Sequence, residues 1–296
     1  MKVTKIVKRY RVDEPRKFHL ARHDPADTGR LDKAAAMKFL DADLERLTEL
    51  QERLYAENRW AVLVVLQGMD AAGKDGVIKH VMSAVDPQGC DVRPFRAPSE
   101  GELEHDFLWR IVKALPERGR IGIFNRSHYE EVLVARVHRE IIGKEKLPPA
   151  LVTGRIWQER FDNIRAFEKH LARSGTVVLK FFLNVSKEKQ RERFLERLEE
   201  PAKRWKFSMG DVAERKLWNR YMAAYQDMIR NTSTPEARWH VVPADHKWFT
   251  HLVVAATLVK ALQDLDLKFP IIKGKALAEM KKVRRALVAE GSRRRP

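Results

Sequence analysis

Short apolar runs alternate with longer amphipathic stretches along most of the chain. The run at 60–67 is rich in aliphatic and β-branched residues and has the length of a buried strand. Similar runs recur downstream, each followed by charged loop residues and a helix-like stretch, which is the order typical of a parallel sheet. The pattern predicts an α/β fold with a five-stranded parallel sheet flanked by helices, with strands at 60–67, 90–95, 121–124, 176–183 and 239–242.

Apolar residues at three- and four-residue steps indicate the helices. The clearest example runs over 33–58, where Leu40, Leu47 and Leu54 recur on a charged background. Further helices are expected over 77–85, 100–114, 129–137, about 149–173, 187–198, 212–230 and 246–265.

The two ends of the chain are more polar than its middle. We expect residues 1–55 to form an N-terminal arm and the long helix, 56–266 to form the core, and 267–296 to form a basic tail. The first thirty residues are basic and contain two prolines, so they are interpreted as an arm that wraps the core or is partly loose. The tail is expected to place Lys281, Lys282, Arg284 and Arg285 on a short helix before Gly291.

The composition is that of a folded protein. Of 296 residues, 44% are hydrophobic, which is enough for the core of one large domain or two modest ones. The lone Cys90 can form no internal disulfide, which favours a reducing, cytoplasmic location. No stretch approaches the roughly 18 apolar residues of a membrane span, so we expect neither export nor membrane insertion.

The charge is strongly positive. The formal net charge is +17, from 58 Lys and Arg against 41 Asp and Glu. Residues 1–20 contribute +5 and residues 273–296 contribute +7, so the ends hold +12 of the total. Such a balance indicates an anionic partner, which is nucleic acid, acidic lipid or a polyanionic substrate.

A glycine-rich loop follows the first predicted strand. It reads Gly-Met-Asp-Ala-Ala-Gly-Lys from Gly68 to Lys74, the Walker A spacing in which backbone N–H groups and a helix N-terminus face an anion. Lys74 is expected to reach the outer phosphates as a point charge. The loop predicts an enzyme that handles phosphoryl groups, with contacts at Gly68, Met69, Ala71, Ala72, Gly73, Asp75 and Gly76.

Two carboxylates distinguish this loop from the common pattern. Asp75 stands where a Ser or Thr usually contacts Mg²⁺, although an acid is also favoured in the first turn of a helix. Asp70 lies inside the loop, where phosphates would repel it unless a cation lies between them. We therefore assign Asp70 to Mg²⁺ and to activation of the acceptor, with a turn-stabilising side chain as the alternative.

A second motif, Asn-Arg-Ser-His-Tyr-Glu, begins at Asn125 after the third predicted strand. Open α/β sheets bind ligands at the carboxyl ends of their strands, so Asn125 and Ser127 are expected phosphate or nucleotide contacts. Asn125 cannot replace the charge of a Walker B aspartate, which leaves Glu130 or Asp70 as the metal carboxylates. Arg126 is expected to meet a phosphoryl oxygen or to form a salt bridge with Asp70 or Glu130, and the two roles are compatible.

A dense basic segment at about 187–211 is predicted to be a helical lid that closes over the substrate and excludes water. Opposite charges at i,i+3 spacing indicate that part of it is an ordinary solvated helix. These pairs are Glu188 with Arg191, Lys189 with Glu192, Arg193 with Glu196, and Arg197 with Glu200. The expected substrate contacts are the cations nearest the break at Pro201, namely Arg193, Arg197, Lys203 and Lys206.

Aromatic residues follow the basic segment. Trp218, Tyr221 and Tyr225 recur at helical spacing, and Trp205 precedes them. Stacking on a nucleobase is one interpretation, but this spacing is more often that of core packing, which we predict here.

The two motifs, together with Lys-x-Trp-Lys-x-Ser at 203–208, resemble the family 2 polyphosphate kinases over about residues 30–265. The resemblance implies a P-loop kinase fold with a helical lid, Mg²⁺ as cofactor, and reversible transfer of the terminal phosphoryl of inorganic polyphosphate to a nucleotide. It also implies Walker A roles for Asp70 and Lys74 and a catalytic role for Arg126. The second motif is similar to that of the class III subgroup, with Glu130 at the position that distinguishes subgroups, so both AMP and ADP are expected acceptors.

The resemblance further suggests a homo-oligomer, for which the helix at 33–58 is a candidate interface. Two other functions remain open from the residues themselves. One is an adenylate kinase-like enzyme that uses ATP as donor. The other is a nucleic-acid-binding protein that uses its basic ends and has a vestigial P-loop; we regard nucleic acid as the less favoured partner.

Overall fold

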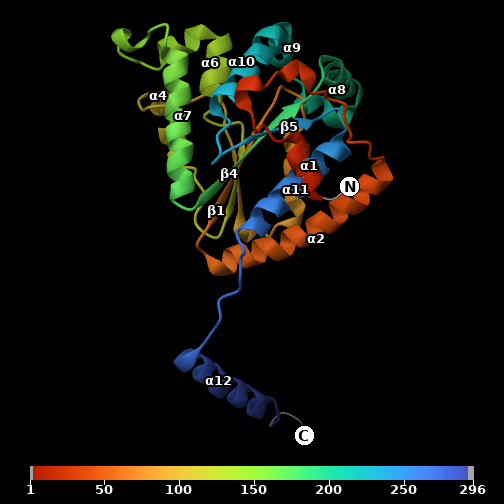
Figure 1. Cartoon of the computed structure of the whole chain (residues 1–296), viewed down its shortest axis with the longest axis vertical. Coiled ribbons are helices and arrows are strands. Elements are labelled where there is room, and N and C mark those ends of the chain that lie inside the picture. Colours follow the sequence, from red (N-terminus) through yellow and green to blue (C-terminus); the bar gives the residue numbers. More distant parts are fainter. Residues whose placement is uncertain (1–2, 293–296) are drawn as a thin grey trace.

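The computed structural model describes residues 3–292. Its centre is one five-stranded parallel sheet with the strand order β2-β3-β1-β4-β5 (Figure 1). Each strand begins and ends within one residue of its predicted bounds, so the predicted sheet is confirmed. The strands are β1 (Ala61–Gln67), β2 (Cys90–Pro94), β3 (Ile121–Asn125), β4 (Thr176–Asn184) and β5 (Trp239–Pro243).

Helices cover both faces of the sheet (Figure 1). On one side the long helix α2 (Lys33–Glu57) packs along α11 (Lys247–Asp264), which also contacts α3 (Lys74–Val81). On the other side α6 (Glu130–Val137), α7 (Ile156–Arg173) and α10 (Trp218–Thr232) contact one another. Because both faces are covered, β1 is buried at every position, which explains its unbroken apolar run.

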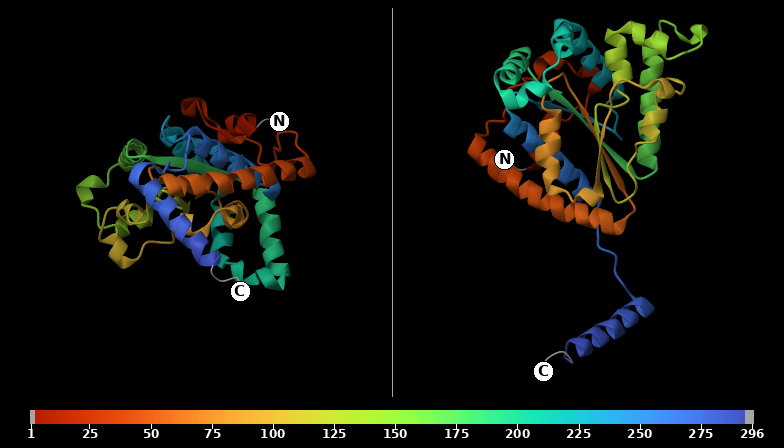
Figure 2. Two further views of the ribbon diagram at one scale, coloured as in Figure 1. Left: turned by 90° about the horizontal axis from the view of Figure 1, so that it is seen from below. Right: turned by 180° about the vertical axis from the view of Figure 1, so that it is seen from behind.

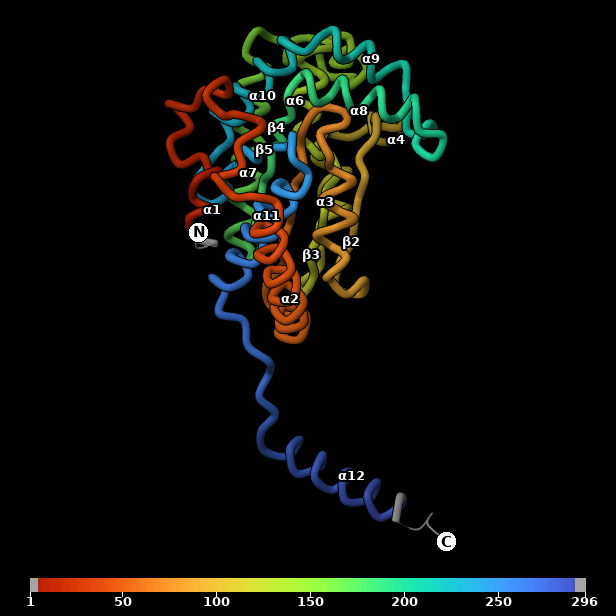
Figure 3. The backbone as a smooth tube through the Cα atoms, turned by 90° about the vertical axis from the view of Figure 1, so that its right-hand side faces the viewer, coloured from red at the N-terminus to blue at the C-terminus, as the bar shows by residue number. Residues whose placement is uncertain are grey.

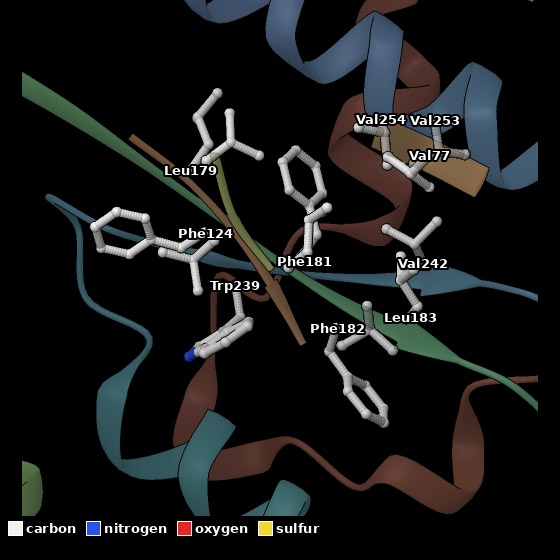
Figure 4. Close-up of a cluster of buried hydrophobic side chains, with 14 of the residues drawn as sticks. Val77, Phe124, Leu179, Phe181, Phe182, Leu183, Trp239, Val242, Val253 and Val254 are labelled. Carbon is white, nitrogen blue, oxygen red and sulfur yellow. The ribbon is translucent and has the colours of Figure 1, made fainter. Parts of the chain in front are cut away.

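The core lies between these layers and is rich in aromatic side chains. Figure 4 shows Trp239, Phe124 and Phe181 in one cluster with aliphatic residues of α3 and α11. Trp218, Tyr221 and Tyr225 of α10 are buried, as the helical spacing predicted, whereas Trp205 is 78% exposed and does not belong to the core. The core interpretation is therefore correct for the three residues of α10 and wrong for Trp205.

Four predicted helices differ from the observed ones. The expected helix at 77–85 is α3, which begins at Lys74 and ends at Val81, and a 3₁₀ turn (Met82–Ala84) follows it. The expected helix at 100–114 is two short pieces, α4 (Glu100–Leu103) and α5 (Trp109–Val112), because the carboxylate of Asp106 accepts a hydrogen bond from the Leu108 N–H and caps a turn. The expected helix at 212–230 divides at Leu217 into α9 (Met209–Lys216) and α10, since the Leu217 N–H bonds to Glu214 O and closes a tighter turn. The segment before α7 begins as a 3₁₀ turn at Pro149–Leu151.

The N-terminal arm wraps the core. Its helix α1 (Val3–Tyr10) contacts α11 and β5, and Ile6 and Tyr10 are buried. The Val12 N–H then donates over 2.9 Å to Trp239 O on β5, the edge strand of the sheet, whose residues are all buried. Of the two sequence interpretations of this arm, the wrapped one is therefore correct for the described residues.

The tail forms one long helix, α12 (Gly274–Ser292), which projects away from the body (Figure 1; Figure 2, right). The predicted short helix ending before Gly291 is thus wrong in extent, because an alanine- and lysine-rich sequence favours helix well beyond the four cations. The rest of the predicted tail, 293–296, lies outside the described residues. No helix within 3–292 is both long and apolar enough to cross a bilayer.

The contact between α2 and α11 gives a test of the packing. Leu47 on α2 is fully buried, and truncation to Ala is expected to lower the free energy of unfolding by about 2–5 kcal/mol, because a cavity replaces its contacts. Met37→Ala on the same helix is the matched control, since Met37 is 37% exposed. Urea unfolding followed by circular dichroism measures both; equal small losses would contradict the described burial.

Candidate active site

The glycine-rich loop lies at the carboxyl end of β1 and leads into α3. Gly73 caps α3 with a left-handed φ of +112°, a conformation that favours glycine. Gly68 passes so close to β4 that a Cβ there would lie 2.9 Å from Leu183 O. The loop therefore depends on both glycines, and its backbone turns toward the N-terminus of a helix, where an anion is stabilised.

Lys74 lies across this loop. Its side chain is almost fully buried, and Nζ donates to Gly68 O at 2.7 Å and to Met69 O at 3.2 Å. Burial lowers the pKa of Lys74, and the nearby Arg126 guanidinium lowers it further. A phosphate in the loop would supply the opposite charge that this lysine lacks among its backbone partners.

Arg126 connects the two sequence motifs. Nη2 donates to Asp70 Oδ1 at 2.8 Å, and Nη1 donates to Glu130 Oε2 at 3.4 Å. The expected salt bridge thus forms with both candidate acids. Burial opposes the charge of Arg126, but the carboxylates of Glu130 and Asp70 outweigh it and raise the pKa. Burial also raises the pKa of Glu130, so this acid depends on a cation beside it.

Asp75 and Asn125 form a pair of their own. The Asn125 amide donates to Asp75 Oδ1 at 2.9 Å, which joins the first turn of α3 to the end of β3. Both residues thus have a structural partner, and the helix-start interpretation of Asp75 is supported. A second acid at position 125 would instead face Asp75 with like charge.

A cavity of about 380 Å³ opens over the loop. It brings together most of the residues that the sequence predicted as contacts, from the loop, the second motif and the basic segment. These are Asp70, Ala71, Gly73, Lys74, Asp75, Gly76, Asn125, Arg126, Arg193, Arg197, Lys203 and Lys206. Gly68, Met69 and Ala72 form the buried side of the loop, while Ser127 and Glu130 line a neighbouring cavity.

The basic segment consists of α8 (Lys187–Glu199), a 3₁₀ turn (Pro201–Lys206) and the start of α9, and it lies above the carboxyl end of the sheet (Figure 3). The ion pairs Glu188–Arg191 and Lys189–Glu192 form as predicted. Arg197 instead pairs with Asp211 at 3.1 Å, so its expected pairing with Glu200 is wrong. Asp211 is far enough along the chain that i,i+3 spacing could not identify it.

Arg193 braces the loop. Nη1 donates to Ala71 O at 2.7 Å and Ala72 O at 3.1 Å, and Nη2 donates to Ala244 O at 2.6 Å. Its expected pairing with Glu196 is therefore wrong, because backbone carbonyls occupy the guanidinium. Gln190, one turn earlier, donates to Asp70 O at 2.9 Å. No pattern in the sequence predicted this hydrogen bond from Gln190 to the loop.

Other cations in the main cavity were missed from the sequence. Lys247 is the first residue of α11, just after β5, so the rule that ligands bind at strand ends would have found it. His80 and His251 stack with their ring centroids 4.8 Å apart. Burial, followed by the charge of His80, lowers the pKa of His251 to about 4, so its ring is neutral at pH 7.

A second cavity, of about 150 Å³, adjoins the first at Arg126. Its walls are mainly apolar, with Phe95 and Phe107 among them, and its rim carries Arg96 and Arg110. Both arginines were missed: Arg96 lies in the loop that follows β2, and Arg110 lies in α5, one of the short helices found in place of the predicted helix at 100–114. Arg126 thus stands between a strongly cationic cavity and a more apolar one.

The residues present fit a magnesium ion. Mg²⁺ takes hard oxygen ligands and is commonly held by one or two carboxylates together with substrate phosphates. Asp70 and Glu130 both face Arg126 between the cavities, which supplies two such carboxylates. Groups of three or more His, Cys, Asp or Glu side chains able to hold a metal do not occur within residues 3–292. Mg²⁺ held by two carboxylates would complete its coordination with water and substrate phosphate oxygens.

The fold and this site define a P-loop phosphotransferase. The family model for polyphosphate kinase 2 matches residues 30–270, and the chain belongs to this family, which confirms the resemblance seen in the motifs. A crystal structure of polyphosphate kinase 2 from Arthrobacter aurescens TC1 superposes with a TM-score of 0.86 at 41% identity, covering 96% of each chain.

Two curated relatives have similar lengths. The ADP-polyphosphate phosphotransferase of Rhodopseudomonas palustris is 47% identical over 265 residues, covering 89% of this chain and 92% of the relative. The AMP/ADP-polyphosphate phosphotransferase of Meiothermus ruber is 47% identical over 266 residues, covering 89% and 96%.

The close approach of Gly68 to Leu183 gives a prediction. Gly68→Ala is expected to lower kcat/KM for phosphoryl transfer about a hundredfold, because the methyl group displaces the loop from β4 by a fraction of an ångström or more. Gly101→Ala is the control, since a Cβ at Gly101 meets no atom within 4 Å. Initial rates with polyphosphate as donor compare the two; a fully active Gly68→Ala enzyme would contradict the tight fit.

Proposed function

We propose that the chain is a Mg²⁺-dependent polyphosphate:nucleotide phosphotransferase that transfers the terminal phosphoryl of inorganic polyphosphate to AMP and to ADP, giving ADP and ATP. The observation that carries this proposal is the position of Arg126 at the junction of a cationic and an apolar cavity. The names of the two curated relatives support both acceptors.

The cationic cavity suits a polyphosphate donor. Its lining carries seven Lys or Arg side chains, namely Lys74, Arg126, Arg193, Arg197, Lys203, Lys206 and Lys247, against four acids, Asp70, Asp75, Glu196 and Asp211. The aromatic rings in that lining are those of two histidines. A nucleoside triphosphate donor would need a larger platform for its base. The lining therefore favours an inorganic chain over ATP.

The second cavity suits the acceptor nucleotide. Phe95 and Phe107 offer aromatic surface to a base, while Arg96 and Arg110 offer charge to phosphate or ribose oxygens. Arg126 lies where this cavity meets the first, and Ser127 lines this cavity next to it. A nucleotide with its base in the apolar part would thus direct its phosphate toward the donor chain.

The mechanism rests on alignment and charge. The attacking oxygen of AMP or ADP is already anionic, so the enzyme needs little proton abstraction. Lys74 and Arg126 would neutralise charge on the phosphoryl group in transfer, and the predicted lid at 187–211 would exclude water. When bound between Asp70 and Glu130, Mg²⁺ would supply further positive charge to the phosphate oxygens. Because a phosphoanhydride is broken and another is formed, the transfer is reversible.

The proposal includes a cytoplasmic homo-oligomer. The lone Cys90 supports a reducing compartment, and the long exposed face of α2 supports a subunit contact. Analytical ultracentrifugation of the full chain tests the assembly: a single species at the monomer mass of 34.5 kDa would exclude it.

The acceptor assay tests the activity. Wild-type protein with Mg²⁺, AMP and polyphosphate as sole donor is expected to form ADP and then ATP, measured by chromatography of the nucleotides. Lys74→Ala is expected to lower the rate about a hundred- to a thousandfold, because it removes a charge that faces the transition state. Lys275→Ala, on the solvent-exposed α12, is the control. Turnover with ATP but not with polyphosphate would instead identify an adenylate kinase-like enzyme.

Removal of the metal gives a further prediction. EDTA is expected to abolish transfer and added Mg²⁺ to restore it. Asp70→Asn is expected to raise the Mg²⁺ concentration for half-maximal rate by about tenfold or more, because a neutral amide holds the cation less tightly. Asp264→Asn, at the exposed end of α11, is the matched control. Unchanged Mg²⁺ dependence in Asp70→Asn would remove Asp70 from the metal site.

A further inference from the structure

Lys180 and Glu168 form a buried salt bridge beside the sheet, and neither residue lines the two cavities described above. Lys180 is on β4 between apolar neighbours and is fully buried, as is Glu168 on α7. Nζ of Lys180 donates to Glu168 Oε2 at 2.6 Å and to Thr232 O at 2.7 Å. Burial alone would raise the pKa of Glu168, but the Lys180 ammonium reverses this and lowers it. The 2.6 Å contact between Nζ and Oε2 is that of a salt bridge.

The pair reaches the second motif through Tyr129. The Tyr129 hydroxyl donates to Glu168 Oε1 at 2.6 Å and accepts from Lys180 Nζ at 2.9 Å. His128 lies beside it, with Nε2 3.6 Å from Glu168 Oε1, and also lines the apolar cavity. Tyr129 is thus hydrogen-bonded to the buried pair, whereas His128 lies near Glu168 without a hydrogen bond to it.

The same turn is also held from β1. Gln67 Nε2 donates to Ser127 Oγ at 3.1 Å, and Ser127 Oγ accepts from the Tyr129 N–H at 3.2 Å. Immediately before this turn Arg126 has a left-handed φ of 64°, which non-glycine residues adopt at some cost. Immediately after it Glu130 begins α6. Of the two residues that flank the turn, Arg126 pairs with Asp70 and with Glu130, and both line the second cavity.

A buried ion pair is a poor source of stability. Taking two charges out of water costs about as much as their attraction returns, and apolar residues of similar size often serve stability equally well. The turn from Arg126 to Glu130, by contrast, needs a rigid support, because catalytic groups must be held within a fraction of an ångström. Lys180 and Glu168 provide this support by hydrogen-bonding the Tyr129 hydroxyl, which apolar side chains could not do.

We propose that Lys180, Glu168 and Tyr129 form a positioning unit that holds the turn between Arg126 and Glu130 in the geometry needed for phosphoryl transfer to the acceptor. This proposal rests on the proposed function, in which Arg126 and Glu130 line the cavity that binds the acceptor nucleotide. The unit itself touches no substrate and acts through the motif.

The test replaces the whole unit by apolar residues. Lys180→Met alone would leave Glu168 as an unpaired buried charge and is expected to unfold the chain. We therefore use the triple variant Lys180→Met, Glu168→Leu, Tyr129→Phe, which leaves neither a buried charge nor a free hydroxyl. It is expected to fold with a urea midpoint near that of wild type, but with kcat/KM for AMP about tenfold lower and KM for polyphosphate changed less than about twofold.

A single substitution has a matched control. Tyr129→Phe removes a buried hydroxyl that bonds both Glu168 and Lys180, and Tyr10→Phe removes a part-buried hydroxyl that donates to Asp27 at 3.0 Å in the N-terminal arm. Both variants are expected to lose stability, with a fall in kcat only in Tyr129→Phe. A fall in kcat of similar size in both would show a general effect of stability and would overturn the proposal.

Hydrogen–deuterium exchange separates this proposal from the proposed function. In the ligand-free triple variant, amides of residues 126–131 are expected to exchange about tenfold faster than in wild type, while the glycine-rich loop is unchanged. This readout needs no turnover, so it holds even if wild type were inactive toward AMP. A folded triple variant with normal exchange there, or with AMP turnover within twofold of wild type, would overturn the proposal.

Discussion

The site depends on the parallel pairing of β1 with both β3 and β4. Their register places Leu66 beside Asn125 and Gln67 beside Phe182, so the loops that follow β1 and β3 leave the sheet at the same edge. This brings Arg126 against Asp70, although 56 positions separate them in the chain. Since the backbone of β1 is hydrogen-bonded on both sides, neither loop can shift without disturbing the sheet.

Charge is the main physical problem at this edge. Lysines and arginines crowd the larger cavity, and Asp70 and Glu130 balance Arg126 in the absence of phosphate. The same two acids are the carboxylates proposed to hold Mg²⁺, so a bound metal and Arg126 would share one pair of carboxylates. Substrate phosphates would supply the negative charge that allows both to remain.

The glycine-rich loop is held by side chains of α8, and the second motif is held by side chains buried in the core. Arg193 and Gln190 of α8 donate hydrogen bonds to backbone carbonyls of the loop. A movement of the predicted lid would therefore shift the backbone at Asp70. Lys180 and Glu168 hold Tyr129 from inside the core. Arg193 and Lys180 are thus cations that bind protein groups and hold the two motifs in place. Other cations in a similar sequence context, such as Lys203 and Lys206, line the cavity instead.

The local sequence was sufficient to predict the five strands, most of the helices, the glycine-rich loop and the second motif, because apolar periodicity and Gly-Lys spacing are local properties of the chain. Contacts between distant segments, by contrast, determine that Arg193 donates to backbone carbonyls, that Arg197 pairs with Asp211, and that Lys180 is buried in the sheet. Arg193, for example, meets a carbonyl 122 positions away. A charged side chain has the same local pattern whether it faces solvent, substrate or a distant carbonyl, and packing selects among them.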